Sequence, residues 1–232
     1  MLLDNKKLIL ITLTGLIYLS YFFGFYFNEN SIGSGGPNGD LIWIWKNFEL
    51  FKNNNLIDAI HHKDFFGNRT PLLYIINIYL NPFINNIYFY RLSIFLFSLI
   101  GPFIFYLCLK NKFENTEKEI LILISSIVLI SPFYRTTAYW GMEINYGLIT
   151  MFIAYYYFQK IGKENEKNIL KVTLLTIFFS SLTIYFDQKL LFVPIIVFFK
   201  IMLTKENLKI KIISLFFFIL LSLPYIYLIY IW

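Results

Sequence analysis

The fold of this chain is decided by two consecutive stretches, LILITLTGLIYLSYFFGFYF (residues 8–27) and NENSIGSGGPNGDLIWIWKNFELFKNNNLIDAIHHKDFFGNRT (residues 28–70). The first is a continuous apolar run of about 20 residues, the length a helix needs to cross the hydrocarbon core of a bilayer. The second is a polar island that holds five of the 14 acidic residues and both histidines. Beyond it, apolar stretches alternate with short lysine-rich connectors. This pattern predicts a polytopic membrane protein whose first span is followed by one substantial polar segment.

The composition supports the same interpretation. Of the 232 residues, 58% are hydrophobic and 21% aromatic, and a soluble domain with this balance would have too little polar surface to cover itself. The apolar runs are continuous and do not alternate, which favours helices over a β-barrel. The net charge of +6 comes from lysines between spans, where membrane topology accounts for them, so we expect no nucleic-acid partner. Because Cys108 is the single cysteine, an intramolecular disulfide and a CxxC metal site are excluded.

We therefore expect an all-α bundle, one membrane domain over residues 1–232. The expected spans number about seven: residues 8–27, 87–109, 119–134, 146–159, 169–186, 190–204 and 210–231. The run from Leu8 to Phe27 is too long and too aromatic for a cleavable signal, and no small-x-small site follows it, so we expect it to be retained as the first span. The last span ends at Trp232, so the sequence is either a whole protein or the N-terminal part of a longer one.

The distribution of basic residues predicts the orientation. If the N-terminus is cytoplasmic, 13 of the 20 basic residues fall in segments 1–7, 110–118, 160–171 and 200–211, and 7 fall on the outer side. This bias follows the positive-inside rule and places the polar island outside the cytoplasm. The residue usage, rich in Lys, Asn, Ile and Phe, is typical of an A/T-rich genome. We expect an integral protein of a bacterial inner (plasma) membrane.

The first outer loop, residues 28–86, is expected to carry interfacial helices. A glycine-rich link, residues 33–39, leads to Asp40, and apolar residues then recur with helical spacing at Leu41, Ile44, Trp45, Phe48 and Phe51. The spacing predicts an amphipathic helix that lies on the outer leaflet, with Asp40 as its N-cap. Residues 71–83 are apolar but too short to span, so they predict a second interfacial helix.

Several features in this order resemble the N-terminal half of GT-C-type integral-membrane glycosyltransferases, the group of the protein O-mannosyltransferases and aminoarabinose transferases. The features are an acid soon after span one, Asp40; a Thr70-Pro71-Leu72-Leu73-Tyr74 stretch that ends the loop; Arg91 at the mouth of span two; and Ser131-Pro132 at the end of span three, before an aromatic-rich segment that reaches Glu143. The likeness covers residues 8–200. It departs from the family pattern at Leu41, where an Asp-Glu pair is frequent, and at Thr70-Pro71-Leu72, where His-Pro-Pro is usual; the large C-terminal domain of many members is absent.

The resemblance implies an inverting transferase that moves a sugar from a polyprenyl-phosphate donor to a cell-envelope glycan, lipid or protein on the extracytoplasmic side. Asp40 would be the general base that removes the acceptor proton. The substrate-binding residues it implies are Arg69, Arg91, Arg135, Glu143, Lys189 and Trp140. All three arginines fall on the outer side, and a guanidinium offers phosphate a planar fork. No cofactor or metal site is indicated by the residues, and dependence on a divalent cation is left open.

Other interpretations stay open. Asp40 can be a helix cap without a chemical role, and Glu143 can form an ion pair with Arg135 across a short loop. The whole chain can be non-catalytic, either a transporter or flippase subunit for a lipid-linked sugar or a truncated pseudoenzyme that works with a partner subunit. The expected partners are a lipid-linked sugar donor and the membrane lipids.

Overall fold

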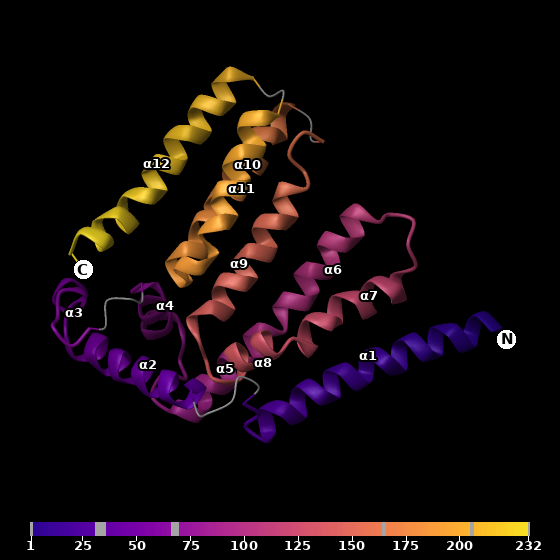
Figure 1. The fold of residues 1–232 in the computed structure, drawn as a ribbon, viewed down its shortest axis with the longest axis horizontal. Helices are drawn as coiled ribbons and strands as arrows, with labels where there is room; N and C mark the ends of the chain where they lie inside the picture. The colour runs from indigo at the N-terminus through magenta and orange to yellow at the C-terminus, as the bar shows by residue number, and fades with distance from the viewer. Residues whose placement is uncertain (1, 31–35, 66–69, 164–165, 205–206, 232) are drawn as a thin grey trace. The chain divides into compact units, whose positions relative to one another are not determined.

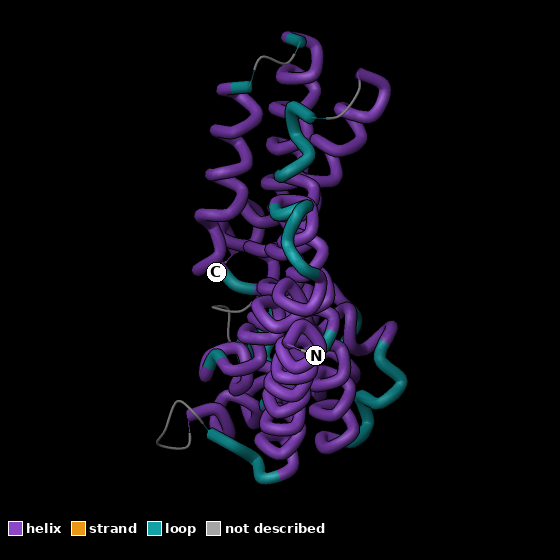
Figure 2. The backbone as a smooth tube through the Cα atoms, turned by 90° about the vertical axis from the view of Figure 1, so that its right-hand side faces the viewer, coloured by secondary structure: helices purple, strands orange, loops and turns teal. Residues whose placement is uncertain are grey.

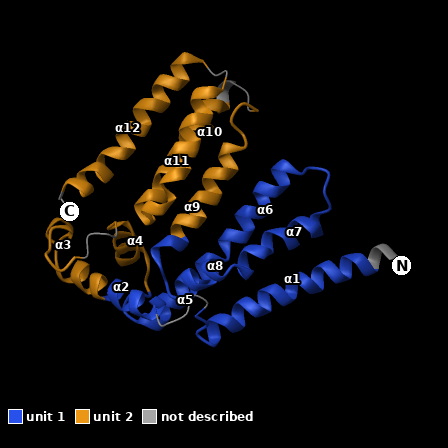
Figure 3. Ribbon diagram, viewed as in Figure 1, with its two compact units in different colours: residues 1–45, 83–145 blue, residues 46–82, 146–232 orange. Residues whose placement is uncertain are grey.

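The structure is a computed structural model that describes residues 2–30, 36–65, 70–163, 166–204 and 207–231. Within these ranges all regular structure is helical, joined by turns and short loops, and no strand is present (Figure 2). The chain divides into two compact units (Figure 3). Unit 1 comprises residues 1–45 and 83–145, and unit 2 comprises residues 46–82 and 146–232. The expected all-α fold is confirmed.

Unit 1 is built around α1 and a group of helices from the middle of the chain (Figure 1). Its elements are α1 (Leu2–Tyr26), the first part of α2 (Gly36–Asn53), α5 (Ile87–Ser98), α6 (Ile100–Lys112), α7 (Lys118–Ser126), the 3-10 helix η1 (Ile127–Ile130), α8 (Pro132–Tyr139) and the start of α9 (Glu143–Phe158). Helix α7 packs against both α1 and α6. Lys6 of α1 pairs with Glu117 at the start of α7, 2.9 Å apart. Segments 1–7 and 110–118, which we expected on one side of the membrane, therefore lie at the same end of this unit.

Unit 2 holds the remaining helices. They are the end of α2, α3 (Leu56–Ile60), α4 (Leu72–Leu80), most of α9, α10 (Glu166–Phe186), the 3-10 helix η2 (Gln188–Leu191), α11 (Phe192–Leu203) and α12 (Leu208–Ile231). Helix α10 packs against both α11 and α12. Ile177 and Ile201 are fully buried in this packing, so α10 is the central helix of the unit.

Four helical segments of the described chain are long and apolar enough to cross a membrane: Asn5–Tyr26, Ile87–Lys112, Asn168–Phe186 and Leu208–Tyr230. A fifth is possible if Lys118–Ile130 and Pro132–Tyr139, bent by 67°, count as one broken span. The chain is thus an all-helical protein with four to five candidate spans. The expected number of about seven is not confirmed, because α9 has 16 residues and α11 has 12, against the roughly 20 that a perpendicular span requires.

The expected span at residues 119–134 is not continuous, and the local sequence explains why. The Ser131 hydroxyl accepts a hydrogen bond from the Tyr134 N–H at 3.5 Å, and Pro132 occupies the first helical position. A serine N-cap followed by proline at N1 starts a new helix, because proline has no N–H to donate to the preceding turn. The chain therefore turns at Ser131 and leaves α8 as a separate short helix.

The helix expected after Asp40 is present, but it differs in two respects. It begins at Gly36, so Asp40 lies in its second turn and is not its N-cap; Pro37 is compatible with this early start because the first turn needs no intrahelical donor. Its apolar face is covered by protein, whereas we expected it on lipid: Phe48 and Phe51 each place their rings 5.2 Å from the ring of Tyr74 in α4. The second expected helix, at residues 71–83, is found as α4.

Candidate functional site: an arginine cluster at the end of α1

The C-terminus of α1 has a geometry that sets two polar side chains in place. Asn28 adopts a left-handed φ of 54°. Its N–H donates to the Phe25 carbonyl at 3.1 Å, and the N–H of Glu29 donates to the Gly24 carbonyl at 2.8 Å. This pair of hydrogen bonds is the Schellman motif, in which asparagine is one of the few residues that tolerate the left-handed position. The motif ends α1 and fixes the directions of Asn28 and Glu29.

Glu29 is the counter-ion of Arg135. Its Oε2 lies 2.5 Å from Arg135 Nη2, and the two side chains are 34% and 10% exposed. The same guanidinium donates through Nη1 to the Ser20 hydroxyl at 3.1 Å and through Nη2 to the Ser20 carbonyl at 2.9 Å. Among the buried polar residues that the structure describes, Arg135 is the only one with a charge. The sequence left open an ion pair between Glu143 and Arg135; the structure pairs Arg135 with the carboxylate of Glu29.

Gly24 lets these groups approach the α1 backbone. A Cβ at this position would lie 2.5 Å from both Arg135 Nη2 and Glu29 Oε2, and 2.6 Å from the Tyr139 hydroxyl. Ser20 and Gly24, four residues apart, lie on the same face of α1 and form a small-xxx-small pair. Because these residues are small, side chains of α8 can approach the main chain of α1 closely. The Tyr139 hydroxyl, for example, donates to the Tyr21 carbonyl at 2.7 Å.

Arg91, in the second turn of α5, is held from three sides. Its Nε donates to the Tyr139 carbonyl at 2.8 Å, its Nη2 donates to the Asn28 side-chain oxygen at 2.8 Å, and its guanidinium carbon lies 4.4 Å from the centre of the Trp140 ring. Trp140 is fixed in turn, because its Nε1 donates to the Glu29 carbonyl at 3.1 Å. Arg91 is partly exposed, and no described residue accepts from its Nη1. The arrangement is a preoriented cation with one donor group available to an anion.

Three of the six expected substrate-binding residues thus meet in one place: Arg91, Arg135 and Trp140. Glu143, at the start of α9, belongs to the same unit and is partly exposed. Lys189 is exposed on η2 and belongs to unit 2. Arg69 lies outside the described residues.

Asp40, the expected general base, is partly buried in the second turn of α2. It precedes the fully buried Ile44 by four residues, so the two lie on one side of the helix. The ring of Trp45, the next residue, lies 6.1 Å from the ring of Tyr90, the neighbour of Arg91. Helix α2 therefore packs beside the start of α5, where the cluster lies.

Glu29 and Asn28 are the residues of this cluster that the sequence did not single out. A signal was available, since asparagine directly after an apolar run is a recognised helix stop. The pairing of Glu29 with Arg135 spans 106 residues of sequence, and no local pattern predicts a contact at that separation. No group of three or more His, Cys, Asp or Glu side chains that could hold a metal ion is found among the described residues.

Comparison with known proteins adds no assignment: no protein-family model, curated protein or solved structure matches this chain.

Proposed function

We propose that this chain is the membrane part of an inverting glycosyltransferase that uses a polyprenyl-phosphate sugar donor. The observation that supports it is the preoriented guanidinium of Arg91, held by Tyr139, Asn28 and Trp140 with its Nη1 directed to no described acceptor. A lipid phosphate at a membrane interface is an anion that such a group binds well. The resemblance of residues 8–200 to GT-C-type transferases points to the same donor.

The proposed reaction divides the roles among residues of unit 1. The acceptor hydroxyl attacks the anomeric carbon of the sugar, and Asp40 takes its proton. The bond between that carbon and the phosphate oxygen breaks, and polyprenyl phosphate leaves with its negative charge. Arg91 stabilises that charge as it develops. Arg135 acts indirectly, because its Nη1 and Nη2 groups donate to Ser20 and Glu29; it holds the α8 segment that supplies Tyr139 and Trp140 to Arg91.

The proposal includes a finer topology of about seven spans, with the N-terminus in the cytoplasm of a bacterium and the cluster on the outer side of the inner membrane. The lysine distribution supports this orientation. The Lys6–Glu117 contact supports the alternation of sides, because it joins two segments that the topology assigns to the cytoplasm. Glu143 and Trp140 would then contact the acceptor or donor sugar.

The test is sugar transfer from synthetic polyprenyl-phosphate-hexose donors by the purified protein, with Mg²⁺ or Mn²⁺ and without metal. Asp40→Asn should lower the rate by about 100-fold or more, the range for loss of a general base. Glu49→Gln is the matched control, an acid-to-amide change at an exposed position of the same helix, and should leave the rate unchanged. Arg91→Lys should lower the rate by about tenfold or more, because an ammonium replaces the planar fork.

Folded wild-type protein that transfers no sugar from any donor would overturn the proposal and favour a non-catalytic subunit. Equal rates for Asp40→Asn and Glu49→Gln would remove Asp40 from the mechanism. Full activity of Arg91→Lys would show that the Arg91 guanidinium is not needed for phosphate binding, and the proposal would lose its main support.

A further inference from the structure

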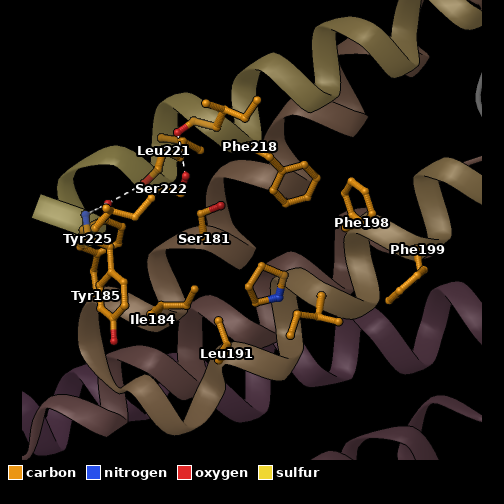
Figure 4. Close-up of a pocket in the computed structure, with 14 residues that line it drawn as sticks. Ser181, Ile184, Tyr185, Leu191, Phe198, Phe199, Phe218, Leu221, Ser222 and Tyr225 are labelled. Atoms are coloured by element: carbon orange, nitrogen blue, oxygen red, sulfur yellow. Dashed lines mark hydrogen bonds between the residues drawn. The ribbon is translucent and has the colours of Figure 1, made fainter. Parts of the chain in front are cut away.

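Helices α10, α11 and α12 of unit 2 enclose a groove of about 450 Å³ (Figure 4). This volume is within the range of small-molecule sites, roughly 300–1,000 Å³. Its lining is aromatic and aliphatic, with Phe198 and Phe199 from α11 and Phe218 from α12 on one side. Helices α10 and α12 are both long and apolar enough to cross a membrane. In a bilayer, these two helices would lie among the acyl chains.

Most polar groups around the groove are already hydrogen bonded within the protein. The Ser222 hydroxyl donates to the Ile219 carbonyl at 2.8 Å. The Tyr185 hydroxyl donates to the Leu221 carbonyl at 2.5 Å and accepts from the Tyr225 N–H at 3.1 Å, so it bridges the α12 backbone beside Pro224. A side chain inserted at a proline satisfies main-chain groups that lipid cannot. The Ser222 and Tyr185 hydroxyls are therefore already used within the protein.

Two hydroxyls of the lining, those of Ser181 and Tyr225, have no hydrogen bond to a described residue, and of these two residues Ser181 is the buried one. Ser181 lies on α10, is 7% exposed and lines the groove (Figure 4), and no hydrogen bond joins its hydroxyl to a described residue. Its neighbours on α10 behave differently: the Ser180 hydroxyl donates to the Ile177 carbonyl at 3.0 Å, and the Thr183 hydroxyl donates to the Ser180 carbonyl at 2.6 Å. A buried hydroxyl that does not use its own helix backbone is poised for an acceptor that the protein lacks.

The depth of Ser181 in the membrane indicates which chemical group could accept a hydrogen bond from its hydroxyl. It lies five residues before Phe186, the end of α10, which is about 7.5 Å along the axis at 1.5 Å per residue. The polar interfacial zone of a leaflet is itself several ångströms deep, because the bilayer is about 40–45 Å thick and its hydrocarbon core about 30 Å. The first polar acceptor that a glycerolipid presents at the top of the hydrocarbon is the ester carbonyl of its acyl chain.

We propose that this groove binds one acyl chain of a membrane glycerolipid, with the ester carbonyl of that chain accepting a hydrogen bond from the Ser181 hydroxyl. The apolar lining takes the methylene chain, and Ser181 sets its depth. The site is independent of the proposed transferase activity, since it lies in unit 2 and uses none of the residues assigned to the reaction.

The first test measures occupancy of the groove. The full chain is placed in phosphatidylcholine nanodiscs that contain a photoactivatable acyl chain, and cross-linked peptides are mapped by mass spectrometry. Ile195→Trp should fill the groove and lower labelling of α10 and α12. Ile196→Trp is the matched control, because Ile196 is the next residue, is 53% exposed against 46% for Ile195, and does not line the groove. Equal labelling of the two variants would overturn the proposal.

The second test concerns the hydrogen bond. Ester-linked and ether-linked phosphatidylcholines compete for the labelled site; the ether lipid has no carbonyl. Wild-type protein should bind the ester lipid about threefold more tightly, which is the affinity ratio that one hydrogen bond of average strength in a membrane protein gives. Ser181→Ala should abolish this preference but still bind the acyl chain. No preference in the wild type would overturn the role of Ser181. Displacement of the label by polyprenyl phosphate more strongly than by the ester lipid would overturn the acyl chain as the occupant.

Discussion

The two units of this protein are each stabilised internally by a different kind of polar interaction. In unit 1 the end of α1 is fixed by a partly buried ion pair, Arg135 with Glu29, and by the stacked guanidinium of Arg91. In unit 2 the buried polar side chains that the structure describes are all uncharged, and the Asn77 side chain accepts from the Tyr146 hydroxyl at 3.2 Å and from Asn81 at 2.9 Å. A charge inside a membrane protein is costly and usually has a function, so the difference directs the search for chemistry to unit 1.

The largest effect is expected from Glu29→Ala. It leaves Arg135, 8% exposed, without its carboxylate, and because Glu29 itself is 34% exposed the expected loss is about 2–3 kcal/mol, less than for a fully buried pair. The exposed pair Lys6–Glu117, with side chains 48% and 44% exposed, is the control: Glu117→Ala should change stability by less than about 1 kcal/mol. Thermal unfolding in detergent measures both. Similar losses would mean that the buried pair is no more important than a surface contact.

Gly24→Ala should have the next largest effect. The added methyl would meet Arg135 Nη2 and Glu29 Oε2 at 2.5 Å, and overpacking of this kind costs about 1–3 kcal/mol. Gly15→Ala, on the same helix, has no atom within 4 Å of the added Cβ and should be neutral, or more stable by up to about 1 kcal/mol from helix propensity. If both variants unfold at the same temperature, close approach of α8 to α1 does not stabilise unit 1.

The neutral network of unit 2 should give the smallest change. Asn77→Ala removes an acceptor for Tyr146 and Asn81 and should cost about 1.5 kcal/mol, since it leaves a buried donor unsatisfied. Tyr146→Phe, which removes one hydrogen bond and keeps the ring stacked on Phe186 at 5.3 Å, should cost about 0.6 kcal/mol. Denaturant titration followed by near-UV circular dichroism measures the free energy of unfolding of both variants. A loss for Asn77→Ala as large as that for Glu29→Ala would remove the distinction between the units.

Much of the fold could be predicted from local patterns, and the departures have local causes. The apolar runs at residues 8–27, 87–109, 169–186 and 210–231 each correspond to a span-length helix. The apolar run at 119–134 does not form one helix, because Ser131 caps and Pro132 begins a new helix within it. Helix α2 starts within the glycine-rich link, at Gly36, and not at Asp40. Pro37 permits this start, because the first turn of a helix needs no intrahelical N–H donor.

The site was predictable in part. Arg91, Arg135 and Trp140 were selected because the planar charge of arginine and the aromatic ring of tryptophan suit a phosphate-bearing lipid at an interface, and the structure brings them together. Glu29 was counted among the acids of the polar island but given no role. Asp40 was selected through a family resemblance, and whether it acts as a base stays a prediction.

By itself the sequence determined the class of the protein: helical, membrane-embedded, with lysine-rich connectors and one polar segment, because hydropathy and charge act over windows of about 20 residues. Only the tertiary structure decided which carboxylate neutralises Arg135, which contacts orient Arg91, and that Ser181 lines a groove without a partner for its hydroxyl. These are contacts between residues far apart in sequence. They depend on how close two helices approach, and glycine and serine on the α1 face set that distance for the arginine cluster.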